Sequence, residues 1–307
     1  MRVVAVVVNW NGGEANVACL RSILAEGLPA TDVVFVDNGS ADGSRELVAR
    51  TFPGLTRLEN AENLGFGAAA NQGAFAALGS GAEAVFFVNN DVVLAPGVVA
   101  RLARALASDA AIGIVGPRVL HMHDRTRVWC AGGMLTWREN LSTLLGHGEP
   151  DGAEHQRTKR VDYVPGCALL ARREVLEGVG SFDARYFAYM EDVDLCLRAT
   201  RAGFACLLVG DAAAYHASSS ATGGGYNPRR KYMMGVNSVW FLRAHARASQ
   251  WLRFLAFDVL TLPFLWIVGV FRGRGKSVLA KGLGILDGLR GRRVTAERIR
   301  AGSSWLW

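Results

Sequence analysis

The sequence lacks the cysteine patterns that mark zinc-finger and disulfide-rich proteins. Five cysteines occur among 307 residues, and no two of them form a CxxC pair. An odd number of scattered cysteines argues against both frameworks and predicts reduced core thiols in a cytosolic protein. They are Cys19, Cys130, Cys167, Cys196 and Cys206. Met1 and Arg2 lead directly into an apolar segment, so we also expect no signal peptide.

Most of the chain has no excess of basic over acidic residues. The net charge is +7, and from residue 243 to residue 307 there are 12 Lys/Arg against three acids. The remaining residues carry 22 Lys/Arg against 24 acids. This distribution argues against a nucleic-acid groove across the whole protein, and it indicates a surface partner for the C-terminal segment.

Strands and helices are expected to alternate through most of the chain. Val3–Val8 and Asp32–Val36 are apolar runs typical of buried strands, and helical patterns follow to about Glu26 and over 41–50. Alternation at this spacing predicts a parallel sheet. Further strands are expected at Leu55–Leu58, Ile112–Val115, Val161–Val164 and Ala205–Val209, and further helices at Ala68–Leu78, Pro96–Ala107 and Glu174–Val179. Periodicity is lost from Gly116 to about Arg160.

The segment Val85–Val93 organises the expected site. It is an apolar run interrupted by Asn89, Asn90 and Asp91, typical of a strand buried on both faces. An acid after such a strand lies where open α/β sheets bind ligands, outside the carboxyl ends. A carboxylate beside two amides suits Mg²⁺ or Mn²⁺, which would hold a diphosphate. The alternative is a polar strand-to-turn junction.

A second acidic group opens a predicted helix near residue 191. Glu191, Asp192 and Asp194 place three acids in four residues, directly after aromatic side chains. Helix capping explains one acid but not all three. Burial near the aromatic rings would raise a carboxylate's pKa and prepare it to act as a general base.

Two histidine positions and one glycine pair have both structural and functional interpretations. His216 follows the last predicted strand, so it is either a structural residue or a third metal ligand. His121 and His123 lie in an expected loop and are interpreted as exposed rather than metal-binding. Gly65 and Gly67 precede a helix, where they form either a tight turn or a backbone approach to an anionic ligand.

Five segments in order carry a family resemblance. They are VVNWNG at 7–12, VDNGSADGS at 36–44, NLGFGAAANQG at 63–73, FVNNDV at 87–92, and PGCALLARREVLEGVGSFDARYFAYMEDVDLCLRA from residue 165. Together they resemble the inverting glycosyltransferases of family 2, in the branch of bacterial rhamnosyltransferases and other O-antigen or cell-wall sugar transferases. The resemblance covers about Val3 to His216. It implies a GT-A (nucleotide-diphospho-sugar transferase) fold, with a mostly parallel central sheet flanked by helices.

The resemblance also implies a donor and a cation site. Asp37 matches the acid that holds the nucleotide's base or ribose, and Asn9, Asn63 and Gly65 lie on loops that would line that pocket. The triplet of Asn89, Asn90 and Asp91 takes the place of the DxD motif. Its first acid is replaced by asparagine, so Asp91 is the retained ligand for Mg²⁺ or Mn²⁺. His216 matches the residue that completes the metal site in some relatives.

The implied reaction is direct displacement at the anomeric carbon with inversion. Asp192 matches the usual base of the family's ED motif, and Glu191 matches its supporting carboxylate. The Q/RxxRW motif of processive members is absent, so we expect one sugar or a few per encounter. The first expectation for the donor is dTDP-rhamnose, with UDP- and GDP-linked sugars open.

Two other classes of function remain as alternatives. One is a non-catalytic nucleotide-sugar-binding or scaffold protein of a polysaccharide assembly complex, because the first acid of DxD is missing. The joint presence of the other matching acids argues against it. The other is a nucleotidyltransferase, which would need a glycine-rich basic loop where this chain has NWNGG.

The C-terminal region, 226–307, is expected to form a basic, apolar, helical tail beyond a catalytic domain at 1–225. Nucleotide binding is expected over about 1–115 and acceptor binding over about 116–225. Phe254–Phe271 is mostly apolar and as a helix would span roughly 27 Å, barely the hydrocarbon thickness. Asp258 within it would cost on the order of 3 kcal/mol at the bilayer centre, which disfavours full spanning.

Flanking arginines and tryptophans instead favour helices lying on anionic lipid. The alternatives are packing on the catalytic domain and a homodimer interface. Arg229 and Arg230 could close over the diphosphate, but a solvated basic face is the favoured explanation of them. We therefore expect a peripheral enzyme on the cytoplasmic face of the bacterial inner membrane, with a lipid-linked saccharide as acceptor.

Overall fold

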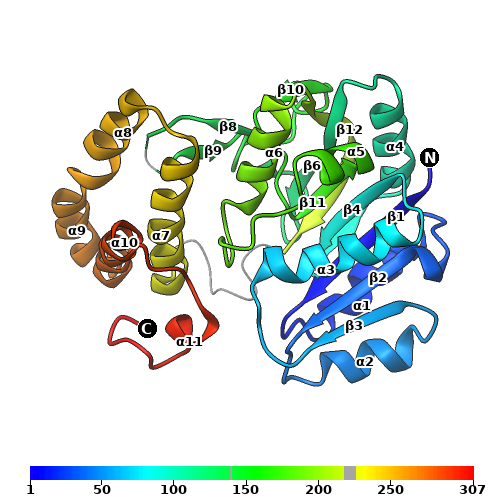
Figure 1. The fold of residues 1–307 in the computed structure, drawn as a ribbon, viewed down its shortest axis with the longest axis horizontal. Helices are drawn as coiled ribbons and strands as arrows, with labels where there is room; N and C mark the ends of the chain where they lie inside the picture. The colour runs from blue at the N-terminus through cyan, green and yellow to red at the C-terminus, as the bar shows by residue number, and fades with distance from the viewer. Residues whose placement is uncertain (139, 218–225) are drawn as a thin grey trace. The chain divides into compact units, whose positions relative to one another are not determined.

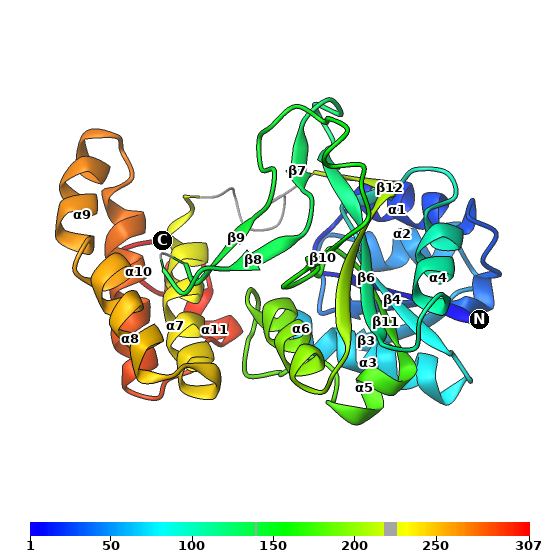
Figure 2. The ribbon, with the colours of Figure 1, turned by 90° about the horizontal axis from the view of Figure 1, so that it is seen from above.

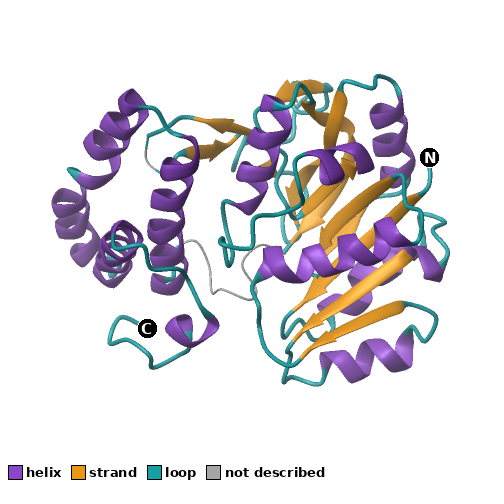
Figure 3. Cartoon of the chain, viewed as in Figure 1, coloured by secondary structure: helices purple, strands orange, loops and turns teal. Residues whose placement is uncertain are grey.

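The computed structural model describes residues 1–138, 140–217 and 226–307. The chain forms two compact units, shown by element in Figure 1 and by secondary structure in Figure 3. The first unit comprises Met1–Met134, Leu144–Asp183 and Asp192–Ala221, and the second comprises Leu135–Thr143, Ala184–Glu191 and Thr222–Trp307. The domain boundary predicted after residue 225 falls at the edge of 218–225, outside the described residues.

A parallel half-sheet forms the N-terminal part of the first unit. Its strands are β1 (Val3–Asn9), β2 (Val33–Asn38), β3 (Thr56–Asn60) and β4 (Ala84–Asn89). They lie in the order β4-β1-β2-β3, all parallel. Every residue of β1 and β2 is buried, because helices cover both faces; Figure 2 shows α3 and α5 on one face and α1 and α4 on the other. The helices of this unit are α1 (Ala15–Leu24), the 3-10 turn η1 (Ala30–Asp32), α2 (Ser44–Thr51), α3 (Phe66–Gly79), α4 (Val98–Ala107), α5 (Arg173–Gly178) and α6 (Glu191–Arg201).

The other half of the sheet is mixed. It contains β5 (Val92–Leu94), β6 (Ile112–His121), β7 (Val128–Cys130), β10 (Lys159–Val161), β11 (Ala168–Arg172) and β12 (Ala205–His216). Strand β11 runs antiparallel to both β4 and β6, whereas β12 is parallel to β6. The stretch without periodicity also holds a separate two-stranded ribbon of β8 (Gly133–Leu135) and β9 (Ser142–Leu144).

The apolar run from Val85 ends at Asn89 as predicted, and Val92–Leu94 form the separate strand β5, which pairs with β12. Three other predicted strands needed correction. The strand expected at Val161–Val164 lies earlier, as β10 (Lys159–Val161). The strand expected at Ile112–Val115 continues to His121, and the strand expected at Ala205–Val209 continues to His216. The two long strands pair along most of their length across a bulge, so His216 lies on the sheet rather than in a loop after it.

All five cysteines lie in the core as free thiols, as expected. Burial raises the pKa of the Cys19 and Cys130 thiols well above the usual range, so these side chains are neutral packing groups.

The second unit is helical. It contains α7 (Pro228–His245), α8 (Ala248–Phe254), the π-helical turn η2 (Leu255–Val259), α9 (Leu262–Phe271), α10 (Gly275–Leu289) and α11 (Ala296–Ile299). The buried Asp287 carboxylate accepts a hydrogen bond from Tyr232 at 2.9 Å and pairs with Arg292 at 2.9 Å and Arg298 at 2.5 Å. These contacts connect α7, α10 and the C-terminal segment.

The apolar run at Phe254–Phe271 differs from the expectation in one respect. Asp258 is fully buried and pairs with Lys281 of α10, and Lys281 also donates to Asn140 at 3.0 Å. The cost of an isolated aspartate therefore does not apply to this helix. Residues Ala248–Phe271 are long and apolar enough to cross a membrane by length and composition alone, with 17% of the most apolar window buried.

Glycines let α7 and α10 approach each other closely. A Cβ added at Gly284 would lie 2.2 Å from the Tyr232 carbonyl oxygen, and one at Gly235 would lie 2.4 Å from the Lys281 carbonyl oxygen. The obstructing atoms are backbone, so a side chain at either glycine would push the helices apart.

Gly284→Ala should therefore lower the free energy of unfolding by about 1–3 kcal/mol, the usual range for overpacking. Gly282→Ala is the matched control on the same helix, since its Cβ would meet only Leu262 Cδ1 at an ordinary 3.7 Å. That control should be neutral or stabilising by up to about 1 kcal/mol, because alanine favours the helix. Thermal unfolding of the two variants compares them directly; equal melting temperatures would contradict the close helix contact.

Candidate active site

Polar side chains gather at the carboxyl edge of the parallel strands. In the sheet register Asn9 of β1 lies beside Asp37 of β2, and Val8 lies beside Asn89 of β4. Each strand is buried along its length and becomes polar only at this end. Because parallel strands end at one edge, three polar ends separated in sequence meet there.

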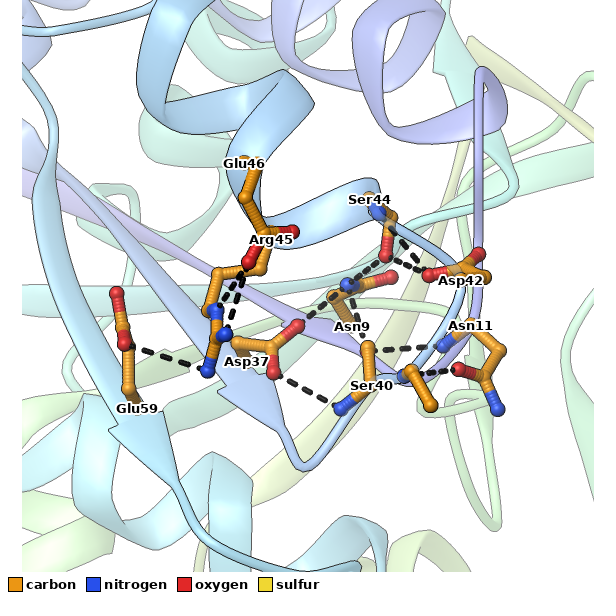
Figure 4. A network of polar contacts seen from close by, with 10 residues as sticks. Asn9, Asn11, Asp37, Ser40, Asp42, Ser44, Arg45, Glu46 and Glu59 are labelled. Carbon is orange, nitrogen blue, oxygen red and sulfur yellow. Dashed lines mark hydrogen bonds and ion pairs between the residues drawn. The ribbon is translucent and has the colours of Figure 1, made fainter.

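Asn9 makes several of the hydrogen bonds at this edge. Its Nδ2 donates to Asp37 Oδ2 at 2.7 Å, to Ser44 Oγ at 2.8 Å and to Ser40 Oγ at 3.0 Å (Figure 4). The other Asp37 oxygen accepts the Ser40 backbone N–H at 3.0 Å. Asp37 is fully buried, so these contacts fix its carboxylate and fold the loop after β2.

The same asparagine connects β1 to the polar triplet after β4. Asn90 Nδ2 donates to Asn9 Oδ1 at 2.9 Å, and the Gly12 backbone N–H donates to that oxygen at 3.0 Å. A Cβ at Gly12 would lie 2.0 Å from Asn90 Nδ2, so glycine is required for this packing. Asn90 therefore positions the loop that carries Asp91.

Asn38 organises the loop of Asn63 and Gly65, and the sequence analysis missed it. Its Nδ2 donates to Asn63 Oδ1 at 2.9 Å and to the Gly65 carbonyl at 3.2 Å. Its Oδ1 accepts from Asn60 Nδ2 and the Leu64 backbone N–H, each at 3.1 Å. The available signal was its place at the end of β2, directly after Asp37. These bonds bring the predicted loop residues to the same edge as Asn9.

Asp91 and His216 meet, as the metal-site prediction requires. Strand β5 pairs with β12 so that Val92 lies beside His216, and His216 Nε2 is 3.1 Å from Asp91 Oδ1. The Asp91 side chain is 9% exposed. The imidazole packs edge-on against the Trp129 ring, with centroids 4.5 Å apart. Sequence analysis did not identify Trp129, which orients the histidine from β7.

These two residues fit a divalent cation. Mg²⁺ and Mn²⁺ are bound through one or two carboxylates and substrate phosphates, and imidazole is an additional ligand that Mn²⁺ accepts. Among the described residues His216 Nδ1 is buried without a hydrogen-bond partner, so the ring is held by packing and by Asp91 rather than by a full set of hydrogen bonds. A cation would complete this polar pair.

Other histidines are placed differently. His121 ends β6 and is partly buried rather than in an exposed loop, with its ring centroid 5.2 Å from that of His123. Within the described ranges, three potential ligand atoms converge within 4.8 Å only at Glu149, Glu154 and His155. There the imidazole already pairs with Glu149 at 3.2 Å and Glu154 at 3.3 Å.

The structure separates the three acids at the start of α6. Asp194 pairs with Arg198 at 2.7 Å one turn later, which is a structural role. Asp192 Oδ2 accepts the Gly166 backbone N–H at 2.8 Å, and Oδ1 accepts the Val193 N–H at 2.8 Å. Burial raises the pKa of Asp192 despite these two bonds. Glu191 is buried, with 7% of its surface exposed.

The backbone before these acids is strained. Tyr189 and Met190 have φ values of 73° and 77°, which side-chain-bearing residues rarely adopt. Asn237, a buried residue that sequence analysis missed, donates to the Ala188 and Tyr189 carbonyls at 2.8 and 2.9 Å. Strain held by specific hydrogen bonds is typical of functional segments.

Burial raises the pKa of the Cys167 thiol well above its usual range, and the charges of Cys130, Asp91 and Asp192 add to that rise. The Cys167 carbonyl also accepts the Asn89 N–H at 2.9 Å, which connects β11 to the polar end of β4. Gly166, whose N–H donates to Asp192, directly precedes Cys167, so adjacent residues contact the segment of Asn89 and the start of α6.

Sequence comparisons place this chain among known proteins. Residues 2–234 match the family described as "Glycosyltransferase like family 2". The N-acetylglucosaminyl-diphospho-decaprenol L-rhamnosyltransferase of Mycobacterium tuberculosis is 30% identical over 209 residues, which cover 62% of this chain and 68% of that protein. Galactofuranosyltransferase GlfT1 of Mycolicibacterium smegmatis is 26% identical over 66% of each chain.

A solved structure is similar over nearly the whole chain. The mannosyltransferase PcManGT from Pyrobaculum calidifontis, solved with GDP-Man and Mn²⁺, aligns with a TM-score of 0.60. The alignment covers 95% of this chain and 88% of that chain at 16% identity, so the likeness concerns the fold alone. It confirms the predicted GT-A fold. The matched family segment extends over more than two thirds of the sequence, and the chain belongs to glycosyltransferase family 2.

Proposed function

We propose that the protein transfers a sugar, with rhamnose as the first candidate, from a nucleotide-diphosphate donor to a lipid-linked saccharide in cell-surface polysaccharide synthesis. The observation that carries this proposal is the meeting of Asp91 with His216 in the unit where burial raises the pKa of Asp192. The rhamnosyltransferase name of the mycobacterial relative supports the sugar and the lipid-linked acceptor.

The donor is proposed to bind at the carboxyl edge of the sheet. Asn9 and Asp37 form its rigid base, Asn63 and Gly65 line the loop beyond it, and Asn89 and Asn90 border the diphosphate. Asp91 and His216 would hold a divalent cation, which neutralises charge on the departing diphosphate when it is bound. The neighbouring mannosyltransferase structure, solved with GDP-Man and Mn²⁺, supports the assignment of a divalent cation, Mg²⁺ or Mn²⁺.

Asp192 is proposed as the base that takes the proton from the acceptor hydroxyl. Its bonds to two backbone N–H groups hold the carboxylate in one orientation, while burial makes it a better proton acceptor than an ordinary aspartate. The oxygen then attacks the anomeric carbon directly from the face opposite the leaving diphosphate. This single displacement inverts configuration and needs no nucleophilic carboxylate. Glu191 is assigned the supporting role, and transfer is proposed to be non-processive.

The helical unit is proposed to lie on the cytoplasmic face of the inner membrane. Several large apolar side chains of η2 and α9 are exposed, and basic residues border them. Such a surface matches a helix lying in a lipid interface with anionic headgroups. Contact with the bilayer would bring the enzyme to a saccharide that cannot leave it. A homodimer through the same apolar helices remains a prediction.

A titration with dTDP-rhamnose, UDP-sugars and GDP-sugars, with and without Mn²⁺, tests the donor assignment. We expect one nucleotide class to bind in calorimetry, with affinity at least tenfold higher when Mn²⁺ is present. Binding of the same nucleotide without its sugar serves as the control for base recognition. Folded protein that binds no member of the panel would instead support a non-catalytic scaffold.

A further inference from the structure

The helical unit contains a cavity of about 100 Å³ between the N-terminal part of α7, α9 and the start of α10. Its wall is apolar on the α9 side, where Leu262 and Leu265 face it, and Val278 of α10 adds to that wall. Its opposite end is cationic, with Lys231, Arg272 and Arg274 among the lining residues. A cavity with one apolar and one cationic end matches an anionic amphiphile rather than a sugar or a neutral lipid.

Tyr226 organises the cationic end. The Arg274 guanidinium lies 4.1 Å from the centroid of its ring, and Lys231 Nζ lies 5.1 Å from that centroid. Ser277 in the first turn of α10 donates a hydrogen bond to the Tyr226 carbonyl, which fixes the segment before α7. The ring thus places two of the cationic side chains at one end of the cavity, where its faces attract their charges.

Acidic residues that could neutralise this charge are scarce in the sequence. Residues 226–286 contain ten Lys/Arg and a single acid, Asp258. Asp258 is fully buried, and its carboxylate pairs with Lys281. Arg272 and Arg274 are both exposed, and in the described part of the chain no acid pairs with either of them. Arginine guanidinium groups bind phosphate oxygens in pairs of hydrogen bonds.

The outer surface of α9 indicates that this anion carries an apolar chain. Phe264, Ile267 and Phe271 are exposed at 68%, 51% and 87% of their surface, whereas Leu262 and Leu265 of the same helix line the cavity. The helix is therefore apolar on both stripes, one toward the cavity and one toward its surroundings. An apolar chain that followed α9 would reach the cationic end at Arg272, directly after the helix.

We propose that this cavity binds the phosphate or diphosphate end of a membrane lipid, a prenyl or acyl phosphate of the kind that would carry the acceptor saccharide. Arg272 and Arg274 bind the phosphate oxygens, and Leu262, Leu265 and Val278 contact the first carbons of the chain. The inference deepens the proposed function and rests on it for the identity of the acceptor. The binding step itself is independent of the donor.

Farnesyl diphosphate is a suitable soluble probe, with inorganic pyrophosphate and farnesol as its separate halves. Trp266 lies on α9 at 41% exposure, so its fluorescence can report binding to the full chain. We expect farnesyl diphosphate to bind at least tenfold more tightly than either half. If pyrophosphate bound as tightly as farnesyl diphosphate, the cavity would be a simple anion site. If farnesol bound as tightly as farnesyl diphosphate, it would be a purely apolar cavity. Either result overturns the proposal.

Paired charge variants test the arginines. The double substitution Arg272→Gln with Arg274→Gln should weaken farnesyl diphosphate binding at least tenfold. Arg253→Gln with Arg300→Gln removes the same charge from two exposed arginines of this unit that do not line the cavity, and it should change binding less than twofold. An equal loss in both pairs would show a general charge effect and overturn the assignment of a site.

Three further measurements separate the possible outcomes. Arg272→Lys with Arg274→Lys keeps the charge but loses the forked hydrogen bonds, so it should bind with intermediate affinity. Thermal unfolding confirms that each variant is folded. Donor titration of the same variants should be unchanged. Loss of lipid-phosphate binding with intact donor binding supports the cavity, whereas a wild-type protein that binds the lipid phosphate but no donor contradicts only the proposed transfer reaction.

Discussion

Asp192→Asn should bind the donor normally and lose transfer activity by about 10²–10⁴-fold, the usual contribution of a general base. An asparagine side chain can still accept the Gly166 N–H through its oxygen, so the local structure should persist. It cannot take the proton from the acceptor hydroxyl. The change should therefore appear in kcat, with the donor Kd from calorimetry unchanged.

Asp194→Asn is the matched control for that substitution. It changes an acid in the same helix turn, but this acid pairs with Arg198 at 2.7 Å. Losing the pair should lower thermal stability while transfer activity at a permissive temperature stays within a few-fold of wild type. Comparable turnover by Asp192→Asn and wild type would rule out the base assignment.

The raised pKa of Asp192 gives the reaction a definite pH dependence. The base works when ionised, so kcat/KM should fall as the pH drops below the raised pKa, at a pH above the ordinary aspartate value of about 3.9. The linked stability effect has the opposite sign. Between the unfolded and folded pKa values the folded state binds more protons, so this group's contribution to stability decreases as pH rises through that window. Both effects should be absent in Asp192→Asn.

Asp91→Asn should remove the dependence of donor binding on Mn²⁺ and lower kcat/KM by about 10²-fold or more. A cation at the leaving diphosphate supplies several kcal/mol of charge stabilisation, and each 1.4 kcal/mol corresponds to a factor of ten. His216→Gln should have a smaller effect of about tenfold, because the carboxylate remains to hold the ion. Titration of Mn²⁺ against donor affinity measures both changes.

Glu154→Gln provides the control for that experiment. It alters the other group of potential ligands in the described part of the chain, Glu149, Glu154 and His155, without touching Asp91. Donor affinity and its Mn²⁺ dependence should match wild type. If Glu154→Gln rather than Asp91→Asn abolished the Mn²⁺ dependence, the cation site would have to be moved to that group.

Local pattern alone was enough to place most of the polar edge of the sheet. The uninterrupted apolar runs of β1, β2 and β4 require a sheet covered on both faces, and parallel strands must end at one edge. Asn9 and Asp37 lie at the ends of β1 and β2, and Asn90 follows β4, so the contacts of Asn9 with Asp37 and Asn90 could be predicted from strand direction. The ordered family segments then gave the GT-A fold and the candidate base.

The roles of several other residues depend on contacts between segments that are distant in the sequence. Asn38 and Trp129 have no pattern of their own, and their roles depend on hydrogen bonds and ring packing to residues far along the chain. Asp194 is the structural acid because it pairs with Arg198, whereas Asp192 accepts a hydrogen bond from the Gly166 N–H. The sequence does not show which acid has which partner. In the same way, Asp258 was an unfavourable charge until its partner Lys281 was located on another helix.

The sequence by itself therefore determined the fold class, the polar edge of the sheet and the short list of candidate acids, because hydrophobic periodicity and strand direction are local properties. The tertiary structure decided that β12 reaches His216 and pairs with β5, which brings the imidazole to Asp91. Strand length and register are set by pairing between segments more than 100 residues apart, where the free energy comes from long-range packing rather than from the residues' own preferences.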